Sequence, residues 1–204
     1  MAKTPGKREL NSEAKKEMIL KKSLELFREY GYEKITITDI CDECKVNVGT
    51  LYHHFGSKVG ILQAISRSIS TADILKEDDM EAVMEPTETI MHFMLAYAKR
   101  WEILGVDLTS HIFQNFRSIY INPVTYTPKE ARTTNRLSRF IGASQKAGCF
   151  DASADADKTA NWIMLIGQGV VYDWCMQNGA YDLSERAIEV MGLIKFLVRG
   201  DVVF

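Results

Sequence analysis

The segment 48–55 predicts a short helix with an apolar inner face, on which Leu51 and Phe55 lie four residues apart. Its outer face is small, hydroxyl-bearing or aromatic and carries few charges, which is unusual for a surface that only meets water. These side chains suit a helix in the major groove of DNA. Glycine permits close approach, a threonine methyl can meet a thymine methyl, and tyrosine and histidine can reach phosphates or base edges. The outward residues, which we expect to face DNA, are Val48, Gly49, Thr50, Tyr52 and His53.

Three neighbouring features position this helix. Thr36 is followed three residues later by Asp39, the pattern of a capped helix start, so a preceding helix is predicted at 36–44. Asn47 caps the helix 48–55 after a tight turn at 44–47. In the first turn of the next helix, the ammonium of Lys58 and the free backbone amides can both engage a phosphate. The segment therefore predicts a helix-turn-helix that contacts duplex DNA, with further contacts from Thr36, Thr38, Asn47 and Lys58.

The N-terminal third of the chain resembles the TetR family of bacterial transcriptional regulators. The residues that carry the resemblance run from the first helix to the start of the helix after the helix-turn-helix. They are Ile19 to Phe27, Tyr30-Gly31-Tyr32, Thr36, Ile40, Val46, Gly49-Thr50-Leu51-Tyr52, His54-Phe55 and Ser57-Lys58. The resemblance covers residues 12 to 70. It implies a ligand-responsive regulator, in which an effector held by the C-terminal part shifts the helix at 57–75 and releases the DNA.

The chain departs from the family pattern at three places. Lys45 stands where the turn between the helices usually has glycine, so a left-handed conformation there would cost about 1 kcal/mol. Gly60 replaces the acidic residue expected three positions after Ser57, which predicts a weak helix start. Cys41 and Cys44 replace the common alanines. None of these departures removes a residue predicted to face DNA.

Cys41 and Cys44 also leave an alternative open, namely a redox- or metal-responsive DNA-binding regulator. The spacing lets the two thiols approach on one helix, but zinc sites usually have a second pair of ligands, and none is evident. We therefore expect no metal site and no cofactor.

The length of 204 residues permits one or two domains, and the net charge is −2. The first sixty residues have a small excess of Lys and Arg, whereas the remainder has an excess of Asp and Glu. The sequence has no apolar run long enough to span a membrane and no signal peptide, and its four cysteines suggest reduced thiols. These features predict a bacterial cytoplasmic protein that associates with the nucleoid when it binds DNA.

Apolar periodicity predicts an all-α chain. A basic flexible arm is expected at 1–11, a three-helix helix-turn-helix DNA-binding domain at 12–72, and a helical-bundle domain for ligand binding and dimerisation at 73–204. The composition changes at 72–86, before Pro86. The N-terminal domain begins with a helix at 12–30. The C-terminal domain is expected to contain helices at 87–104, 107–120, 128–147, 155–178 and 183–199.

The helices at 155–178 and 183–199 have more apolar surface than a single core requires. The first has small residues on one face and large ones on the other. We expect both helices to pair with their copies across a two-fold axis. The predicted interface residues are Ala160, Met164, Gly167, Val171, Cys175, Ala187, Met191, Ile194 and Val198. Such a homodimer places two recognition helices about 34 Å apart, which suits a near-palindromic operator.

Aromatic residues cluster in the C-terminal domain, which is consistent with a site for a small, apolar or aromatic effector. The alternative is that these rings fill the core. The candidate effector-binding residues are Trp101, His111, Phe113, Phe116, Tyr120, Trp162, Gln168 and Tyr172.

Two other classes of protein are disfavoured. An enzyme is not expected, because the sequence has no glycine-rich phosphate loop, no G-x-S-x-G motif and no H-E-x-x-H motif. A helical interaction protein would lack salt-dependent affinity for duplex DNA. The favoured hypothesis is a homodimeric repressor, released from its operator by a small effector.

Overall fold

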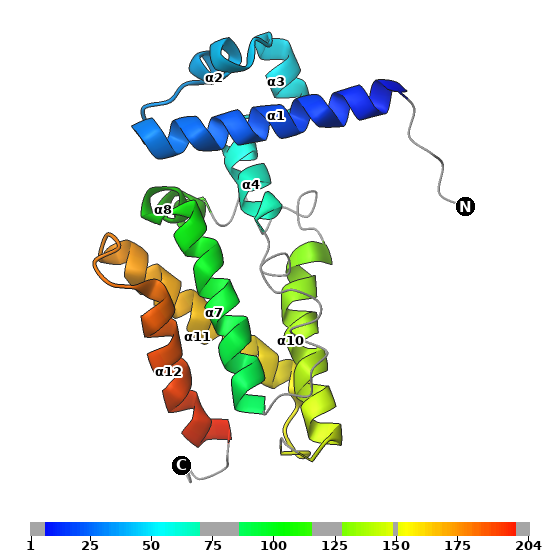
Figure 1. Cartoon of the computed structure of the whole chain (residues 1–204), viewed down its shortest axis with the longest axis vertical. Helices are drawn as coiled ribbons and strands as arrows, with labels where there is room; N and C mark the ends of the chain where they lie inside the picture. Colours follow the sequence, from blue (N-terminus) through cyan, green and yellow to red (C-terminus); the bar gives the residue numbers. More distant parts are fainter. Residues whose placement is uncertain (1–6, 70–85, 116–127, 149–150, 199–204) are drawn as a thin grey trace.

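The computed structural model describes residues 7–69, 86–115, 128–148 and 151–198, and these residues form helices and no strands. They fall into two groups in space (Figure 1): α1, α2 and α3 lie at one end, and α4 extends from them toward a bundle of the later helices. The predicted all-α fold is confirmed. Within the described residues, no helix is long and apolar enough to cross a membrane.

The N-terminal group contains α1 (Lys7–Tyr30), α2 (Ile37–Cys44), α3 (Val48–Phe55) and α4 (Lys58–Ser68). The predicted helices are present, with two differences in length. Helix α1 begins at Lys7, so residues 7–11 are helical and do not belong to an extended arm; residues 1–6 lie outside the described residues. Helix α4 ends at Ser68, and the expected boundary at 72–73 also lies outside the described residues.

The core of this group is built from one apolar face of each helix. Phe27 of α1, Ile40 of α2, Leu51 of α3 and Ile61 of α4 are all fully buried. Burying a side chain of this kind contributes about 1.5–3 kcal/mol. Since these faces point inward, the opposite faces of α2 and α3 are presented to solvent.

The C-terminal group contains α7 (Pro86–Leu104), α8 (Val106–Gln114), α10 (Pro128–Lys146), α11 (Ala156–Met176) and α12 (Leu183–Val198). Helix α7 runs through the group and packs against α8, α10, α11 and α12, while α10 packs along α11 (Figure 1). The core of the group includes Phe93, Leu108, Leu137 and Ile163.

Helix α4 and the end of α1 attach the N-terminal group to α7 and α8. The Arg100 guanidinium on α7 donates to the carbonyl oxygens of Ile69 (2.6 Å) and Ser66 (2.8 Å), which lie at the C-terminal end of α4. The backbone amide of Tyr32 donates to the Asp107 carboxylate on α8 at 2.9 Å. Helix ends leave backbone groups without partners, and these contacts satisfy some of them. They also fix the N-terminal group to the bundle.

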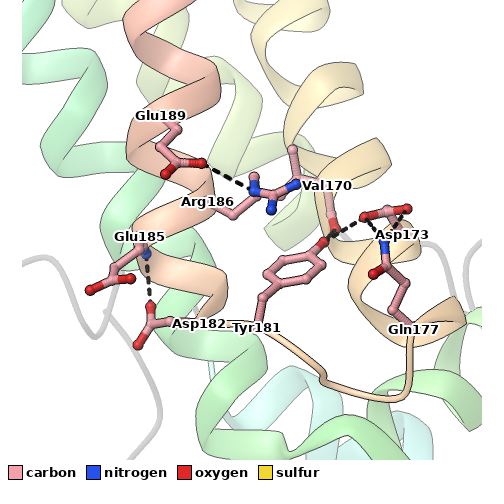
Figure 2. A network of polar contacts seen from close by, with 8 residues as sticks. All are labelled: Val170, Asp173, Gln177, Tyr181, Asp182, Glu185, Arg186 and Glu189. Atoms are coloured by element: carbon pink, nitrogen blue, oxygen red, sulfur yellow. Dashed lines mark hydrogen bonds and ion pairs between the residues drawn. The ribbon is translucent and has the colours of Figure 1, made fainter.

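Tyr181 joins the end of α11 to the start of α12 (Figure 2). Its hydroxyl lies 2.8 Å from the Asp173 carboxylate and 3.2 Å from the Val170 carbonyl oxygen, and the Arg186 guanidinium lies over its ring. Gln177 also donates to Asp173, so hydrogen bonds from Tyr181 and Gln177 lower the pKa of that carboxyl. These contacts fix how α11 and α12 are oriented to one another.

The Tyr181 contacts predict a loss of stability at high pH. Burial and the hydrogen bond to Asp173 raise the pKa of Tyr181 to about 12, from about 10 in an unfolded chain. Between about pH 10 and about pH 12, the unfolded chain loses the phenol proton before the folded chain does. The stabilisation by the Tyr181 hydroxyl is therefore lost as pH rises through this range. We expect Tyr181→Phe to be less stable than the wild type at pH 7. The difference in free energy of unfolding should shrink as pH rises above 10, as measured by urea unfolding. A difference that stays constant would contradict this prediction.

Candidate nucleic-acid interface

The start of α2 is fixed by a reciprocal pair of hydrogen bonds. The Asp39 amide donates to Thr36 Oγ1 at 3.2 Å, and the Thr36 amide donates to Asp39 Oδ2 at 2.7 Å. This is the predicted capping box, and the hydrogen bonds from Thr36 lower the pKa of Asp39. Thr36 and Thr38 are exposed at this end of α2. Both are therefore available to a ligand outside the protein.

Lys45 adopts the left-handed conformation in the turn between α2 and α3, with φ 53° and ψ 45°. Its amide donates to the Asp42 carbonyl oxygen, and the Val46 amide donates to that of Cys41. The turn thus has the geometry that usually favours glycine, and lysine adopts it at a cost of about 1–2 kcal/mol.

Asn47 caps α3 and also holds a residue of its outer face. Its Oδ1 accepts from the Thr50 amide at 2.7 Å and from the Thr50 hydroxyl at 2.9 Å. The Thr50 hydroxyl proton is therefore used internally, while its lone pairs and methyl group remain. The Asn47 cap fixes the first turn of α3, on which Val48 and Gly49 are exposed.

Four of the five outward residues predicted on α3, Val48, Gly49, Tyr52 and His53, are exposed, whereas Thr50 is half-buried. The side chains of Val48 and Tyr52 are 44% and 49% exposed, and His53 is also exposed, whereas Leu51 is fully buried. A Cβ atom at Gly49 would meet nothing in the protein closer than Asn47 Oδ1 at 3.5 Å. The fold itself therefore does not require glycine at this position.

His54, next to this face, is half-buried. Burial first, and then His53 and Lys16, lower the pKa of His54. The imidazole of His54 therefore favours its neutral form, and His53 is the more accessible of the two rings.

Lys58 lies at the start of α4 but is directed back toward the end of α1. Its Nζ lies 4.2 Å from the centre of the Tyr32 ring and donates to the Glu33 carbonyl oxygen at 3.3 Å. Burial lowers the pKa of this ammonium. A phosphate contact from Lys58 therefore requires its side chain to leave Tyr32 and Glu33 or to share its protons with them.

The structure explains why residue 60 is glycine, which the sequence did not reveal. A Cβ atom there would lie 1.8 Å from the Phe55 carbonyl oxygen, so α4 approaches the end of α3 too closely for any side chain. The Ser57 hydroxyl still accepts from the Gly60 amide at 3.0 Å. Glycine at position 60 thus lacks the acidic side chain of a full capping box, but it permits the close approach of α3 and α4.

The structure does not favour the alternative hypothesis of a redox- or metal-responsive regulator that uses Cys41 and Cys44. Both thiols are buried, and burial raises the pKa of each, which disfavours the reactive thiolate. Across the described residues, no group of three His, Cys, Asp or Glu side chains could hold a metal ion.

The candidate effector residues do not form one cluster. Trp101, Phe113 and Tyr172 form a row of rings from α7, α8 and α11, with centres 5.5 Å and 6.0 Å apart. His111 instead stacks on Tyr32, at the contact between the two helix groups. Trp162 is 63% exposed on the outside of α11 and does not join the row. Gln168 is half-buried, and Phe116 and Tyr120 lie outside the described residues.

Six of the nine predicted dimer residues lie on the inner faces of α11 and α12, so the prediction is wrong for them. Ala160, Met164, Gly167, Val171, Ala187 and Met191 are buried in the core of the same chain, so a second copy cannot reach them. Gly167 faces α7, where an added Cβ atom would lie 2.5 Å from the flexible end of Met94, at Cε. Cys175 is half-buried, and the side chains of Ile194 and Val198 lie outside the described residues.

The opposite face of these helices is apolar and exposed. It includes Trp162, Leu165 and Met176 on α11, each more than half exposed, and Leu193 on α12. The residues of α11 recur at helical spacing and lie on one stripe, and exposed apolar stripes often mark an interaction site. We call this set the outer α11–α12 face.

Arg100 and Asp107 join the two helix groups, and the sequence did not single them out. Each is one charged residue on an amphipathic helix, and nothing in its spacing distinguishes it from a solvated charge. The approach of α4 and of Tyr32 gives these residues their partners in the N-terminal group.

Comparisons with known proteins agree with the resemblance. Residues 19–65 match the family model of bacterial regulatory proteins, tetR family. The HTH-type transcriptional regulator UidR of Escherichia coli K12 is 45% identical over 47 residues, which cover 23% of this chain and 24% of UidR. The regulator HbdR of Aromatoleum sp. strain CIB is 31% identical over 138 residues, covering 67% of this chain and 60% of HbdR. The match to each of these curated relatives therefore spans less than two thirds of its length.

Solved structures with this fold include complexes with lauroyl-CoA and with stearoyl-CoA. Thermus thermophilus FadR, a TetR-family transcriptional repressor in complex with lauroyl-CoA, superimposes with a TM-score of 0.67 at 18% identity, covering 93% of this chain and 96% of FadR.

Proposed function

Because this chain belongs to the TetR family of bacterial regulatory proteins, we propose that it is a homodimeric repressor that binds a near-palindromic operator through α3. The observation that carries the proposal is the exposed outer face of α3 around Val48, Gly49 and Tyr52. An apolar and aromatic face of this kind is costly in water but can meet base edges and thymine methyl groups in a major groove. Thr36 and Thr38 can add phosphate contacts from the start of α2.

The outer α11–α12 face supplies the dimer contact in this proposal. A second copy would cover Trp162, Leu165 and Met176. These side chains lie outside the core of their own chain and are exposed in the single copy. A two-fold axis between the copies presents two α3 helices to the same side of the duplex. Successive major grooves lie about 34 Å apart, so the operator is expected to consist of two inverted half-sites.

The effector binds in the C-terminal group and is apolar or aromatic. Two observations support this part of the proposal: the row of rings Trp101, Phe113 and Tyr172, and the acyl chain that FadR of the same fold binds as lauroyl-CoA. Release of DNA requires the effector to prefer the conformation that does not fit the operator. Weakening operator binding 100-fold needs about 2.7 kcal/mol of coupling.

Binding to selected duplex DNA tests the proposal. Genomic fragments retained by the purified protein are expected to share an inverted repeat. Affinity for that repeat should fall by about 10³-fold or more between 50 and 200 mM salt, because phosphate contacts release counterions. A scrambled repeat of equal length is the control. No enriched repeat, or an affinity independent of salt, would rule out the operator-binding role.

A further inference from the structure

The indole N–H of Trp101 is buried, and it has no acceptor among the described residues. The residue is 3% exposed, and among the described parts of the chain no hydrogen-bond partner lies near its Nε1. The surroundings are aromatic, with Tyr97 edge-on at 6.0 Å and Phe113 at 5.5 Å between ring centres. The Arg100 guanidinium lies over the ring, 4.4 Å from its centre. Buried tryptophan N–H groups usually have a partner, and an unpaired one destabilises the fold.

Trp174 provides the internal comparison. It is also buried, at 7% exposure, but its Nε1 donates to the Tyr181 carbonyl oxygen at 3.0 Å. The same bundle thus satisfies one buried indole and leaves the other unsatisfied. An unsatisfied buried donor in a native fold is a candidate for binding a ligand.

The row of rings connects this donor to the surface of the bundle. Trp101 is buried, Phe113 is half-buried and Tyr172 is 53% exposed. An apolar molecule can pack along these rings if Phe113 turns aside. The backbone carbonyl of Trp101 is already engaged by the Thr109 hydroxyl at 3.4 Å, so the indole N–H is the polar group of Trp101 that remains available.

We propose that the Trp101 indole N–H donates a hydrogen bond to an uncharged oxygen acceptor, such as a ketone, ester or amide carbonyl, on an otherwise apolar effector. An uncharged acceptor is favoured because a carboxylate among these rings would lose its hydration and gain a single donor from Trp101, while the Arg100 guanidinium over that ring is directed to the Ser66 and Ile69 carbonyl oxygens. The inference rests on the proposed effector response and specifies its chemistry. Binding is also coupled to α4, since Arg100 stacks on Trp101 while it holds the Ser66 and Ile69 carbonyl oxygens.

Matched ligands with and without the acceptor test the inference on the full-length protein by calorimetry. One pair is β-acetylnaphthalene and β-isopropenylnaphthalene, and a linear pair is methyl nonyl ketone and its methylidene isostere. Within at least one pair, the wild type is expected to bind the ketone about tenfold more tightly than its isostere. In Trp101→Phe, which keeps a ring but removes the donor, the preference should disappear. In the control Trp174→Phe it should persist.

Four outcomes would overturn the inference: equal binding within both pairs, no binding of any probe, a preference that survives Trp101→Phe, or tighter binding of β-naphthoate than of the ketone. If Trp101→Phe fails to fold, a double variant that combines Trp162→Phe with Trp174→Phe leaves Trp101 as the one indole. Ultraviolet resonance Raman spectroscopy of that variant should then show its N–H becoming hydrogen-bonded when the ketone is added and not when the isostere is added.

The operator assay separates this inference from the proposed function. If the ketone preference holds but the ligand-free protein binds no enriched repeat, the regulatory role fails and the ligand site stands. If operator binding holds but no ketone preference appears, the regulatory role stands and the assignment of Trp101 fails.

Discussion

Tyr52→Ala is expected to weaken operator binding by at least about 30-fold, which corresponds to about 2 kcal/mol. One lost base or phosphate contact costs about 1–3 kcal/mol, and a homodimer loses it in both half-sites. Because the Tyr52 side chain is half exposed and its hydroxyl has no internal role that the structure shows, the free energy of unfolding should change by less than about 0.5 kcal/mol. Fluorescence anisotropy with the operator duplex, together with urea unfolding, measures both quantities.

Tyr30→Ala is a matched control for this substitution. Tyr30 is also 49% exposed, but it lies at the C-terminal end of α1 and outside α3. It should therefore reproduce any general effect of removing an exposed tyrosine and leave operator affinity unchanged. Equal losses from both variants, or no loss from Tyr52→Ala, would remove α3 from the interface.

Leu165→Asp is expected to raise the dissociation constant of the dimer by roughly 10³-fold, or about 4 kcal/mol. Leu165 is 65% exposed on the outer α11–α12 face, so an aspartate there leaves the folded chain nearly unchanged. In the dimer, two copies of the carboxylate would be buried against apolar surface without partners. Analytical ultracentrifugation should show the 23.1 kDa chain shifting from dimer to monomer at micromolar concentration.

Met18→Asp is the control for the dimer prediction, because Met18 is an exposed apolar residue of α1, outside α11 and α12. It should remain a dimer. Operator affinity of Leu165→Asp should fall together with dimerisation, since a monomer contacts a single half-site. A wild-type protein that stays monomeric at every concentration, or a Leu165→Asp variant that still dimerises, would place the interface elsewhere.

The sequence by itself determined the features that depend on neighbours along the chain. The Thr36–Asp39 capping box and the Asn47 cap each involve residues three positions apart, so local hydrogen bonds decide them. The helical spacing of the apolar residues around Ile40 in α2 and Leu51 in α3 likewise fixed which faces of the two helices are buried. Local rules therefore gave the all-α fold and the exposed face of α3.

Tertiary structure alone decided how the helices use their remaining surface. Helix α11 is apolar on two sides, and periodicity cannot say which side meets the chain's own core. The side of α11 that carries Gly167 faces α7 and is buried, whereas the side that carries Trp162 and Leu165 is exposed. Long-range approach also gave Lys58 its contact with Tyr32 and gave Arg100 and Asp107 their partners. The physical reason is that these contacts join residues far apart in the chain, whose approach no local preference determines.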